Sequence, residues 1–303
     1  MSAESAAVQP LATLVPDASA RPARTPMQLA WLRLRRAKLA LAGLAVFIAM
    51  LLVAIFADVL APYGRNEIDL FNITAPPSRA HWLGTDGLGR DELSRLIYGG
   101  RLSLWIGISA AVLTVALGTV IGAIAGYYGG KVDGALMRFV DLMLAFPSIF
   151  LLLILAAMLE GISVTGVILF LGLFSWMWLA RIIRGEFLSL KAREFVEAAR
   201  SIGAPDRRII LQHLLPNVLG PIIVSITLDI ALFMLAEASL SFLGFGVQSG
   251  TPTWGNMLNE AKSEYLTVPR LAIIPGLTLT IAVLAINFIG DGLRDAFDPR
   301  GGR

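Results

Sequence analysis

The sequence predicts an all-α integral membrane protein with six transmembrane helices and both termini in the cytoplasm. Three observations support this fold class. First, 56% of the 303 residues are apolar and only 16% are charged, whereas soluble domains carry about 25% charged residues. Second, long uncharged runs recur along the chain, and about 20 apolar residues form a helix that crosses a bilayer. Third, the basic residues are concentrated in alternate connecting segments.

The uncharged runs divide the chain into a tail, a first anchor and a core. Residues 1–37 are expected to be a disordered cytoplasmic tail, because their N-terminal part is rich in Ala, Pro and Ser. The first transmembrane helix is expected at 38–61 and an outer segment at 62–101. A core with five transmembrane helices is expected over 102–293, before a cytoplasmic tail at 294–303. The uncharged runs are Leu39–Ala57, Leu102–Gly130, Leu142–Leu159, Gly161–Ala180 and Leu271–Gly290, with Asn217–Gly246 interrupted only by Asp229 and Glu237.

The orientation follows from the basic residues. With a cytoplasmic N-terminus, the cytoplasmic segments hold 18 of the 25 Lys and Arg residues. Basic residues accumulate on the cytoplasmic side of membrane proteins, so the opposite orientation is disfavoured. The same bias accounts for the net charge of +3, so nucleic acid is not an expected partner. The chain has no cysteine, which excludes disulfides and thiol chemistry.

Consecutive glycines mark one face of the second predicted span. Gly118, Gly122 and Gly126 recur at intervals of four residues. Small residues at this spacing let two helix backbones approach closely in a membrane. The stripe therefore predicts a helix–helix contact rather than a ligand site.

A charged stretch at 184–216 lies on the predicted cytoplasmic side between two uncharged runs. Arg181–Ser201 is predicted to continue the fourth span into the cytoplasm as a helix. The helical spacing predicts one apolar face, formed by Phe195, Ala199 and Ile202.

Glycine and proline divide this stretch into two helices. Gly203 suits a helix end because it adopts positive φ without penalty. Pro205 suits the start of a second helix, which is expected to break at Pro216. The pattern indicates a protruding helical hairpin. An ordinary cytoplasmic loop is the alternative interpretation, and a DNA-binding helix-turn-helix is disfavoured because two spans tether the segment.

The hairpin contains Glu197-Ala198-Ala199, then Gly203, then Leu215-Pro216. This pattern resembles the cytoplasmic EAA loop of ABC importer permeases, although His213 stands where the family usually has Ile. Other segments resemble the dipeptide/oligopeptide permeases in the same order along the chain, over about 32–300. These segments are His81–Leu104, Asp141–Pro147, Glu237–Gly246 and Pro252–Leu258.

The resemblance implies a type I ABC importer permease fold in a bacterial cytoplasmic membrane. It implies a second, homologous permease subunit as a heterodimer partner, two ABC ATPase subunits and an extracytoplasmic peptide-binding protein. The chain contains no phosphate-binding loop motif, so it is not expected to be an enzyme, and ATP and Mg are expected to bind the ATPase subunits. By resemblance, the ATPase-docking residues are Phe195, Glu197, Ala198, Ala199, Ser201, Ile202, Gly203, Ala204 and Pro205.

The resemblance implies that the substrates are di- or oligopeptides, and related permeases carry nickel or glutathione. A rival interpretation is a stand-alone, proton-coupled secondary transporter that uses Asp229 and Glu237 as a relay. Charges inside a span usually face a cavity or a partner, so both residues are candidates for the translocation pathway. The alternatives are a hydrogen bond between Asp229 and a neighbouring helix, and a position of Glu237 near the outer end of its span.

The outer segment is predicted to contain a short amphipathic helix. Asp91 and Arg95 are spaced for an ion pair on one helix face, and Gly99-Gly100 is expected to end the helix. This helix is expected either to meet the binding protein or to cover the outer mouth. His81 and His213 lie on opposite sides of the predicted membrane with no carboxylate cluster or cysteine beside them, so neither a metal site nor a catalytic triad is expected.

Overall fold

The computed structural model describes residues 31–147, 150, 151, 153, 154, 158, 162–247 and 250–297. Among these residues, β pairing is limited to two isolated bridges, and the predicted all-α class is confirmed. The helices are α2 (Lys38–Ile55), α3 (Ala57–Leu60), α4 (Glu92–Tyr128), α5 (Gly130–Leu144), α7 (Val164–Leu173), α8 (Trp176–Leu190), α9 (Glu194–Ser201), α10 (Asp206–Arg208), η1 (Ile209–Leu214), η2 (Leu215–Val218), α11 (Leu219–Phe242), α12 (Trp254–Glu260), η3 (Ala261–Ser263) and α13 (Arg270–Phe297).

Five helical stretches in the described part of the chain are long and apolar enough to cross a membrane. They correspond to the first, second, fourth, fifth and sixth predicted spans. The structure describes only parts of the predicted third span, Leu142–Leu159, so the number six stays a prediction. The five stretches are Lys38–Ile55, Glu92–Tyr128, Val164–Leu190, Asp206–Phe242 and Arg270–Phe297.

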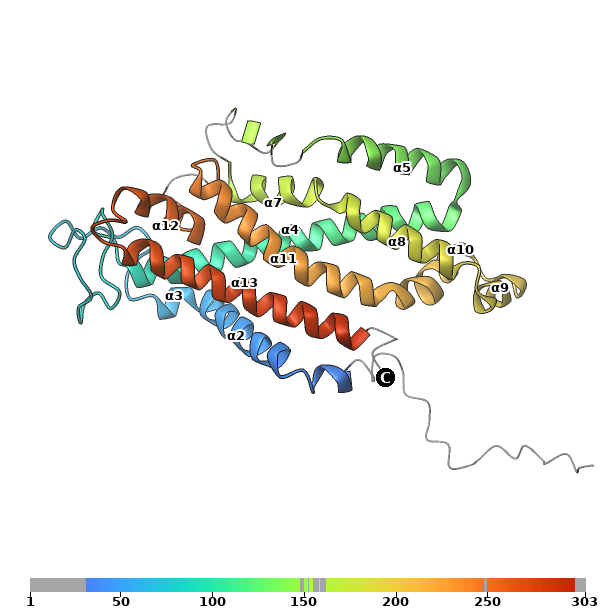
Figure 1. Ribbon diagram of the computed structural model, residues 1–303, viewed down its shortest axis with the longest axis horizontal. Coiled ribbons are helices and arrows are strands. Elements are labelled where there is room, and N and C mark those ends of the chain that lie inside the picture. Colours follow the sequence, from blue (N-terminus) through green and yellow to red (C-terminus); the bar gives the residue numbers. More distant parts are fainter. Residues whose placement is uncertain are drawn as a thin grey trace, which may run out of the picture.

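Helix α4 is the centre of the bundle. It packs against α2, α7, α8 and α11, while α13 packs between α2 and α11. The long helices run along the long axis of the molecule (Figure 1). The segment before α4 and helix α12 lie at one end, and α9 and α10 lie at the other. The hairpin and the outer segment are therefore at opposite ends, as two sides of a bilayer require.

The glycine stripe lies where α4 meets α8. A Cβ added to Gly122 would lie 2.5 Å from the carbonyl oxygen of Ala180, and one added to Gly126 would lie 2.6 Å from Cβ of Phe187. Both distances are too short for real contacts, so a larger residue would push the two helices apart. The predicted close helix–helix contact is confirmed.

The predicted short outer helix ending at Gly99-Gly100 is wrong. Helix α4 runs without interruption from Glu92 to Tyr128, through both glycines. A Cβ on Gly100 would lie 2.8 Å from the ring of Trp254 in α12. The two glycines therefore make room for α12 against the helix rather than ending it.

The orientation is testable because the chain has no native cysteine. Ala135 in α5 and Leu266 after η3 are both exposed, on opposite predicted sides of the membrane. In intact cells, an impermeant thiol reagent should label Leu266→Cys at once and Ala135→Cys only after permeabilisation. The reverse pattern would invert the topology, and the cysteine-free chain controls for background labelling.

Candidate functional site

The turn of the hairpin is a helix C-cap closed by glycine. Helix α9 ends at Ser201, and Gly203 has φ of +80°. The Gly203 N–H donates to the carbonyl of Arg200 at 3.0 Å, and the Ala204 N–H donates to that of Ala199 at 3.1 Å. These two bonds form a Schellman motif, which reverses the chain tightly and requires the left-handed backbone at glycine.

The hairpin buries a different face from the predicted one. Val196 and Ala199 are buried, whereas Phe195 is 42% exposed and Ile202 is 85% exposed. The predicted apolar face of Phe195, Ala199 and Ile202 is therefore not the face that packs against the bundle, because only Ala199 of the three is buried. Residues three apart also lie on one helix face, and Val196 with Ala199 is the pair that reaches the bundle. Two large apolar side chains are left facing outward.

The second arm continues into the membrane without the predicted break. Pro205 precedes α10 as its N-cap, and Pro216 lies in the first turn of the 3₁₀ helix η2. The chain passes through a π-helical stretch, η1, before η2 and α11. The missing N–H of Pro216 is tolerated there because helix geometry changes at this point. The result is a stretch of altered helix geometry between hairpin and span.

A polar and apolar base holds the hairpin against the bundle. Val196, Ala199, Ile209 and Leu214 pack in one buried cluster with Tyr127 at the end of α4. The polar part could not be predicted from a local pattern, because its partners are far apart in the chain. The Tyr127 hydroxyl donates to Oδ1 of Asp206 at 2.6 Å, and Nζ of Lys191 donates to the Tyr127 carbonyl at 3.2 Å.

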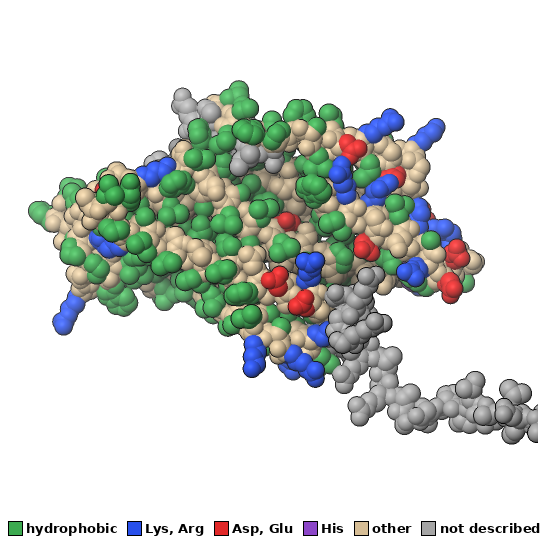
Figure 2. All heavy atoms as spheres, in the orientation of Figure 1, with side chains coloured by type: hydrophobic (Ala, Val, Ile, Leu, Met, Phe, Trp, Pro, Cys, Tyr) green, Lys and Arg blue, Asp and Glu red, His purple; other side chains and the backbone are tan. Residues whose placement is uncertain are grey.

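Two arginines of α8 connect the base of the hairpin to α5. Nη2 of Arg184 donates to Oδ2 of Asp133 at 2.6 Å, and Nε contacts the other carboxylate oxygen. The hydrogen bond from Arg184 lowers the pKa of Asp133 below its ordinary value. Arg181 forms a similar pair with Asp141. Figure 2 shows charged side chains gathered toward this end, while the middle of the visible face is mostly hydrophobic.

Most of the predicted docking residues form one exposed surface at the tip. Ala199 is buried and Ala204 is half-buried. No Cβ added to Gly203 would contact another atom within 4 Å. Small residues beside an exposed apolar side chain suit close contact with a partner, so docking at this surface stays a prediction. The exposed members are Phe195, Glu197, Ala198, Ser201, Ile202, Gly203 and Pro205.

The two carboxylates of α11 have different surroundings. Asp229 is half-buried and accepts a hydrogen bond from Ser225 Oγ at 3.2 Å, one helical turn away. Glu237 is 0% exposed and lies toward the outer end of the helix. The pathway role of both residues stays a prediction. Of the two side chains, only that of Asp229 is partly exposed.

Glu237 connects three segments through hydroxyl groups. Its Oε1 accepts hydrogen bonds from Ser241 Oγ at 2.7 Å and from Thr253 Oγ1 at 2.8 Å, while Ser103 Oγ lies 3.5 Å from Oε2. Ser103 also accepts from the Trp254 N–H at 3.1 Å. The buried carboxylate thereby connects α4, α11 and the start of α12.

The outer end carries a network of buried ion pairs. Asp91 does not pair with Arg95 as predicted; it caps α4, with Oδ2 accepting from the Ser94 N–H at 2.8 Å. Arg95 instead lies 2.6 Å from Asp86 and 2.7 Å from Glu260, between Nη and carboxylate oxygens. Arg90 pairs with the same two carboxylates at 2.7 Å each. Guanidinium and carboxylate groups therefore hold the outer loop onto α4 and α12.

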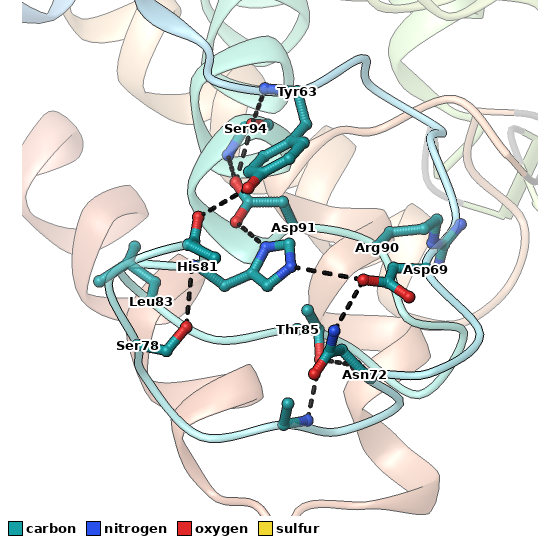
Figure 3. Close-up of polar contacts among 12 residues, drawn as sticks. Tyr63, Asp69, Asn72, Ser78, His81, Leu83, Thr85, Arg90, Asp91 and Ser94 are labelled. Atoms are coloured by element: carbon teal, nitrogen blue, oxygen red, sulfur yellow. Dashed lines mark hydrogen bonds and ion pairs between the residues drawn. The ribbon is translucent and has the colours of Figure 1, made fainter.

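The outer loop before α4 and helix α12 are together called the outer cap (Figure 1), and His81 lies in this loop. Its Nδ1 lies 2.9 Å from Oδ1 of Asp91, its Nε2 lies 4.0 Å from Oδ2 of Asp69, and its ring stacks on Tyr63 (Figure 3). Two carboxylates from different parts of the outer loop therefore lie beside the His81 ring. Ser94 contacts the other oxygen of Asp91 and not the histidine. The arrangement orders the loop and lacks the nucleophile–base contact of a catalytic triad.

Two family models match the chain. Residues 118–302 match the binding-protein-dependent transport system inner membrane component, and residues 25–77 match the N-terminal transmembrane domain of oligopeptide transport permease C. The first match covers more than half of the chain and includes the entire hairpin.

Curated relatives and one solved structure agree with these matches. The glutathione transport system permease protein GsiD of Escherichia coli O6:K15:H31 (strain 536 / UPEC) is 43% identical over 278 residues, which cover 91% of each chain. GsiD of Shigella boydii serotype 4 (strain Sb227) has the same identity and coverage. A structure of the MetNI methionine ABC transporter in inward-facing conformations superposes with a TM-score of 0.55 at 18% identity. It covers 67% of this chain and 96% of that one, which supports the fold.

Proposed function

We propose, since this chain belongs to the family of inner-membrane components of binding-protein-dependent transport systems, that it imports small peptides, glutathione among them. It is a permease subunit of an ABC importer in the bacterial inner membrane, with the type I importer fold. The peptide substrate is supported by the oligopeptide permease match at the N-terminus and by the 43% identity to glutathione permeases. The observation that carries the proposal is the hairpin, which protrudes at the end opposite the outer cap.

The hairpin is proposed as the contact with an ATPase subunit. The chain has no phosphate-binding loop motif, so ATP and Mg bind the ATPase subunits. This chain contributes one hairpin, so a second, homologous permease subunit would engage the second ATPase. An extracytoplasmic binding protein delivers the substrate at the outer end, where Asp86, Arg90 and Glu260 order the cap.

The geometry suggests how movement of the ATPases reaches the membrane. The hairpin packs on the ends of α4 and α8 through its buried cluster, and Tyr127 bonds to Asp206 at its base. Its second arm continues through η1 and η2 into α11. Closure of the ATPases on ATP would therefore push α9 and α10 and move these three helices together. Hydrolysis would release them and turn the pathway toward the cytoplasm.

Reconstitution tests this function. The permease pair, its ATPases and the binding protein are placed in proteoliposomes, and uptake of labelled glutathione, dialanine and Ni²⁺ is measured. ATP-dependent uptake of a peptide that requires the binding protein is the expected result. If only Ni²⁺ is taken up, the proposed peptide substrate is wrong and the importer carries nickel. Uptake by this chain alone, driven by a proton gradient, would instead support a secondary transporter.

Asp229 provides a test of the pathway. Asp229→Asn keeps the side-chain shape and its contact with Ser225 but removes a charge from the membrane-spanning part of α11. We expect normal assembly and at least about a tenfold change in uptake rate, which corresponds to about 1.4 kcal/mol in the barrier. Ser239→Ala, on an exposed site of the same helix, is the control. Unchanged uptake by assembled Asp229→Asn would remove this residue from the pathway.

A further inference from the structure

An apolar groove runs between the outer half of α2 and α4. Its volume is about 440 Å³, and ordinary ligand pockets have volumes of about 300–1,000 Å³. Except for Arg101, the side chains that line it are apolar, and they include Ile55 of α2 and Trp105 of α4. Ile55 is 62% exposed and Trp105 is 60% exposed, so the groove opens on the outside of the bundle. Both helices are long and apolar enough to cross a membrane, which places the groove at membrane depth.

Water is a poor occupant of this groove. A bound water needs two to four polar partners, and apolar side chains supply none. At membrane depth, the occupant is therefore an apolar chain. Two occupants have this chemistry: an acyl chain of a lipid, and a transmembrane helix of the second permease subunit.

A charged pair lies at the outer end of the groove. Nη1 of Arg101 donates to Oδ2 of Asp58 in α3 at 2.9 Å, and the two side chains are 47% and 67% exposed. A guanidinium has five N–H donors and a carboxylate has two acceptor oxygens, so this single contact leaves both groups able to bind a second partner. Because α3 follows α2 at its outer end (Figure 1), the pair lies at the level of the lipid headgroups.

This pair favours a lipid over a protein helix as the occupant. A helix packed over the groove would take two exposed charges out of water, and the desolvation penalty can exceed the attraction within the pair. A lipid instead places its own charged headgroup at this level while its acyl chain enters the groove. Trp105 supports this depth, because tryptophan is enriched at membrane–water interfaces. One wall of the groove, α2, also lies outside the residues 118–302 that match the transport-system component.

The two charges specify the headgroup. A phosphate forms charge-assisted hydrogen bonds with an arginine, whereas the carboxylate of Asp58 repels a headgroup that carries only negative charge. An ammonium group beside the phosphate removes this conflict, because it can pair with Asp58.

We infer that this groove binds a phospholipid of the phosphatidylethanolamine type from the outer leaflet. Its phosphate contacts Arg101, its ammonium contacts Asp58, and one acyl chain lies between α2 and α4. The lipid thereby fills the space between the first span and the central helix of the bundle. The inference does not depend on which substrate the transporter carries.

The test uses the assembled transporter in lipid nanodiscs with equal amounts of phosphatidylethanolamine and phosphatidylglycerol. A bimane fluorophore is attached to Val59→Cys, which is next to Asp58 and 81% exposed. Brominated acyl chains quench this fluorophore, and they are placed on phosphatidylethanolamine in one set of nanodiscs and on phosphatidylglycerol in the other. The complex with the cysteine-free chain measures labelling of the partner subunits.

Phosphatidylethanolamine should associate at least about threefold more strongly than phosphatidylglycerol, as one additional exposed ion pair predicts. The same fluorophore on Ile273→Cys, exposed near the outer end of α13, should show no preference. Equal quenching by both lipids at position 59 would show ordinary surrounding lipid. No quenching by either lipid would show that a protein subunit covers the groove. Either result, or an equal preference at position 273, would overturn the inference.

Variants locate the site. Arg101→Gln removes the phosphate contact and Asp58→Asn removes the ammonium contact, so each should abolish the preference for phosphatidylethanolamine. Both side chains are exposed, so either substitution costs little stability, and size-exclusion chromatography checks assembly. Arg79→Gln, on an exposed arginine of the outer loop that does not line the groove, should keep the preference. A preference that survives both substitutions at the charged pair would place lipid selection elsewhere and refute the site.

Discussion

Replacing Gly203 with leucine should abolish recruitment of the ATPase subunits while the permease still inserts and folds. Gly203 has φ of +80°, and a non-glycine residue there costs about 1 kcal/mol in backbone strain. A Cβ meets nothing within 4 Å, so the strain adds no clash inside the chain. A leucine would instead project from the exposed turn into the space of a docked partner. We expect co-purification of the ATPases to fall at least about tenfold, a loss of about 1.4 kcal/mol in binding.

Gly130 provides a matched control for this substitution. It also has a positive φ, of +53°, and open space around its Cβ position, and it lies near the same end of the molecule but outside the hairpin. Gly130→Leu therefore imposes similar backbone strain without changing the tip. It should keep ATPase co-purification and substrate-stimulated hydrolysis near wild type. Equal retention of ATPases by Gly203→Leu would show that the hairpin is an ordinary loop.

The two glycine signals for a helix end had opposite outcomes. Gly203 ends α9, as predicted, because nothing packs against the exposed turn and the backbone preference of glycine decides the structure. Gly99 and Gly100 do not end α4, although each costs about 1 kcal/mol in a helix relative to alanine. Trp254 packs against them, and this tertiary contact outweighs the local preference. The preference of glycine for a helix end therefore decided the structure at the exposed turn and was overridden under α12.

Much of the candidate site depends on pairs that no local pattern contains. Hydropathy is sufficient to predict the spans because the bilayer constrains their length and composition. The pair of Tyr127 with Asp206 joins residues 79 apart, and that of Arg184 with Asp133 joins residues 51 apart. Such pairs become visible only when the helices are packed. The buried face of α9 was equally hard to predict, because the helical spacing allows two apolar faces that share Ala199. One contains Phe195 and Ile202, and the other contains Val196, which is the one that is buried.

Glu237 should be the most sensitive position in the outer half of the bundle. Glu237→Leu removes the acceptor of the Ser241 and Thr253 hydroxyls and the neighbour of Ser103, all of them buried. An unsatisfied buried hydroxyl costs at least about 1 kcal/mol, so the total loss is about 3 kcal/mol. We expect the melting temperature of the purified complex to fall by at least about 5 °C, and α12 to become accessible to proteases.

Glu237→Gln separates this structural role from a role in the pathway. Its amide oxygen still accepts hydrogen bonds from Ser241 and Thr253, and its amide group can donate to Ser103. If the carboxylate serves only to join α4, α11 and α12, this variant should melt within about 2 °C of wild type and transport normally, because the hydrogen bonds persist without the charge. Intact stability with lost uptake would instead show that the charge itself acts in transport. Wild-type stability of Glu237→Leu would contradict the structural role, since the three hydroxyls would then need no acceptor.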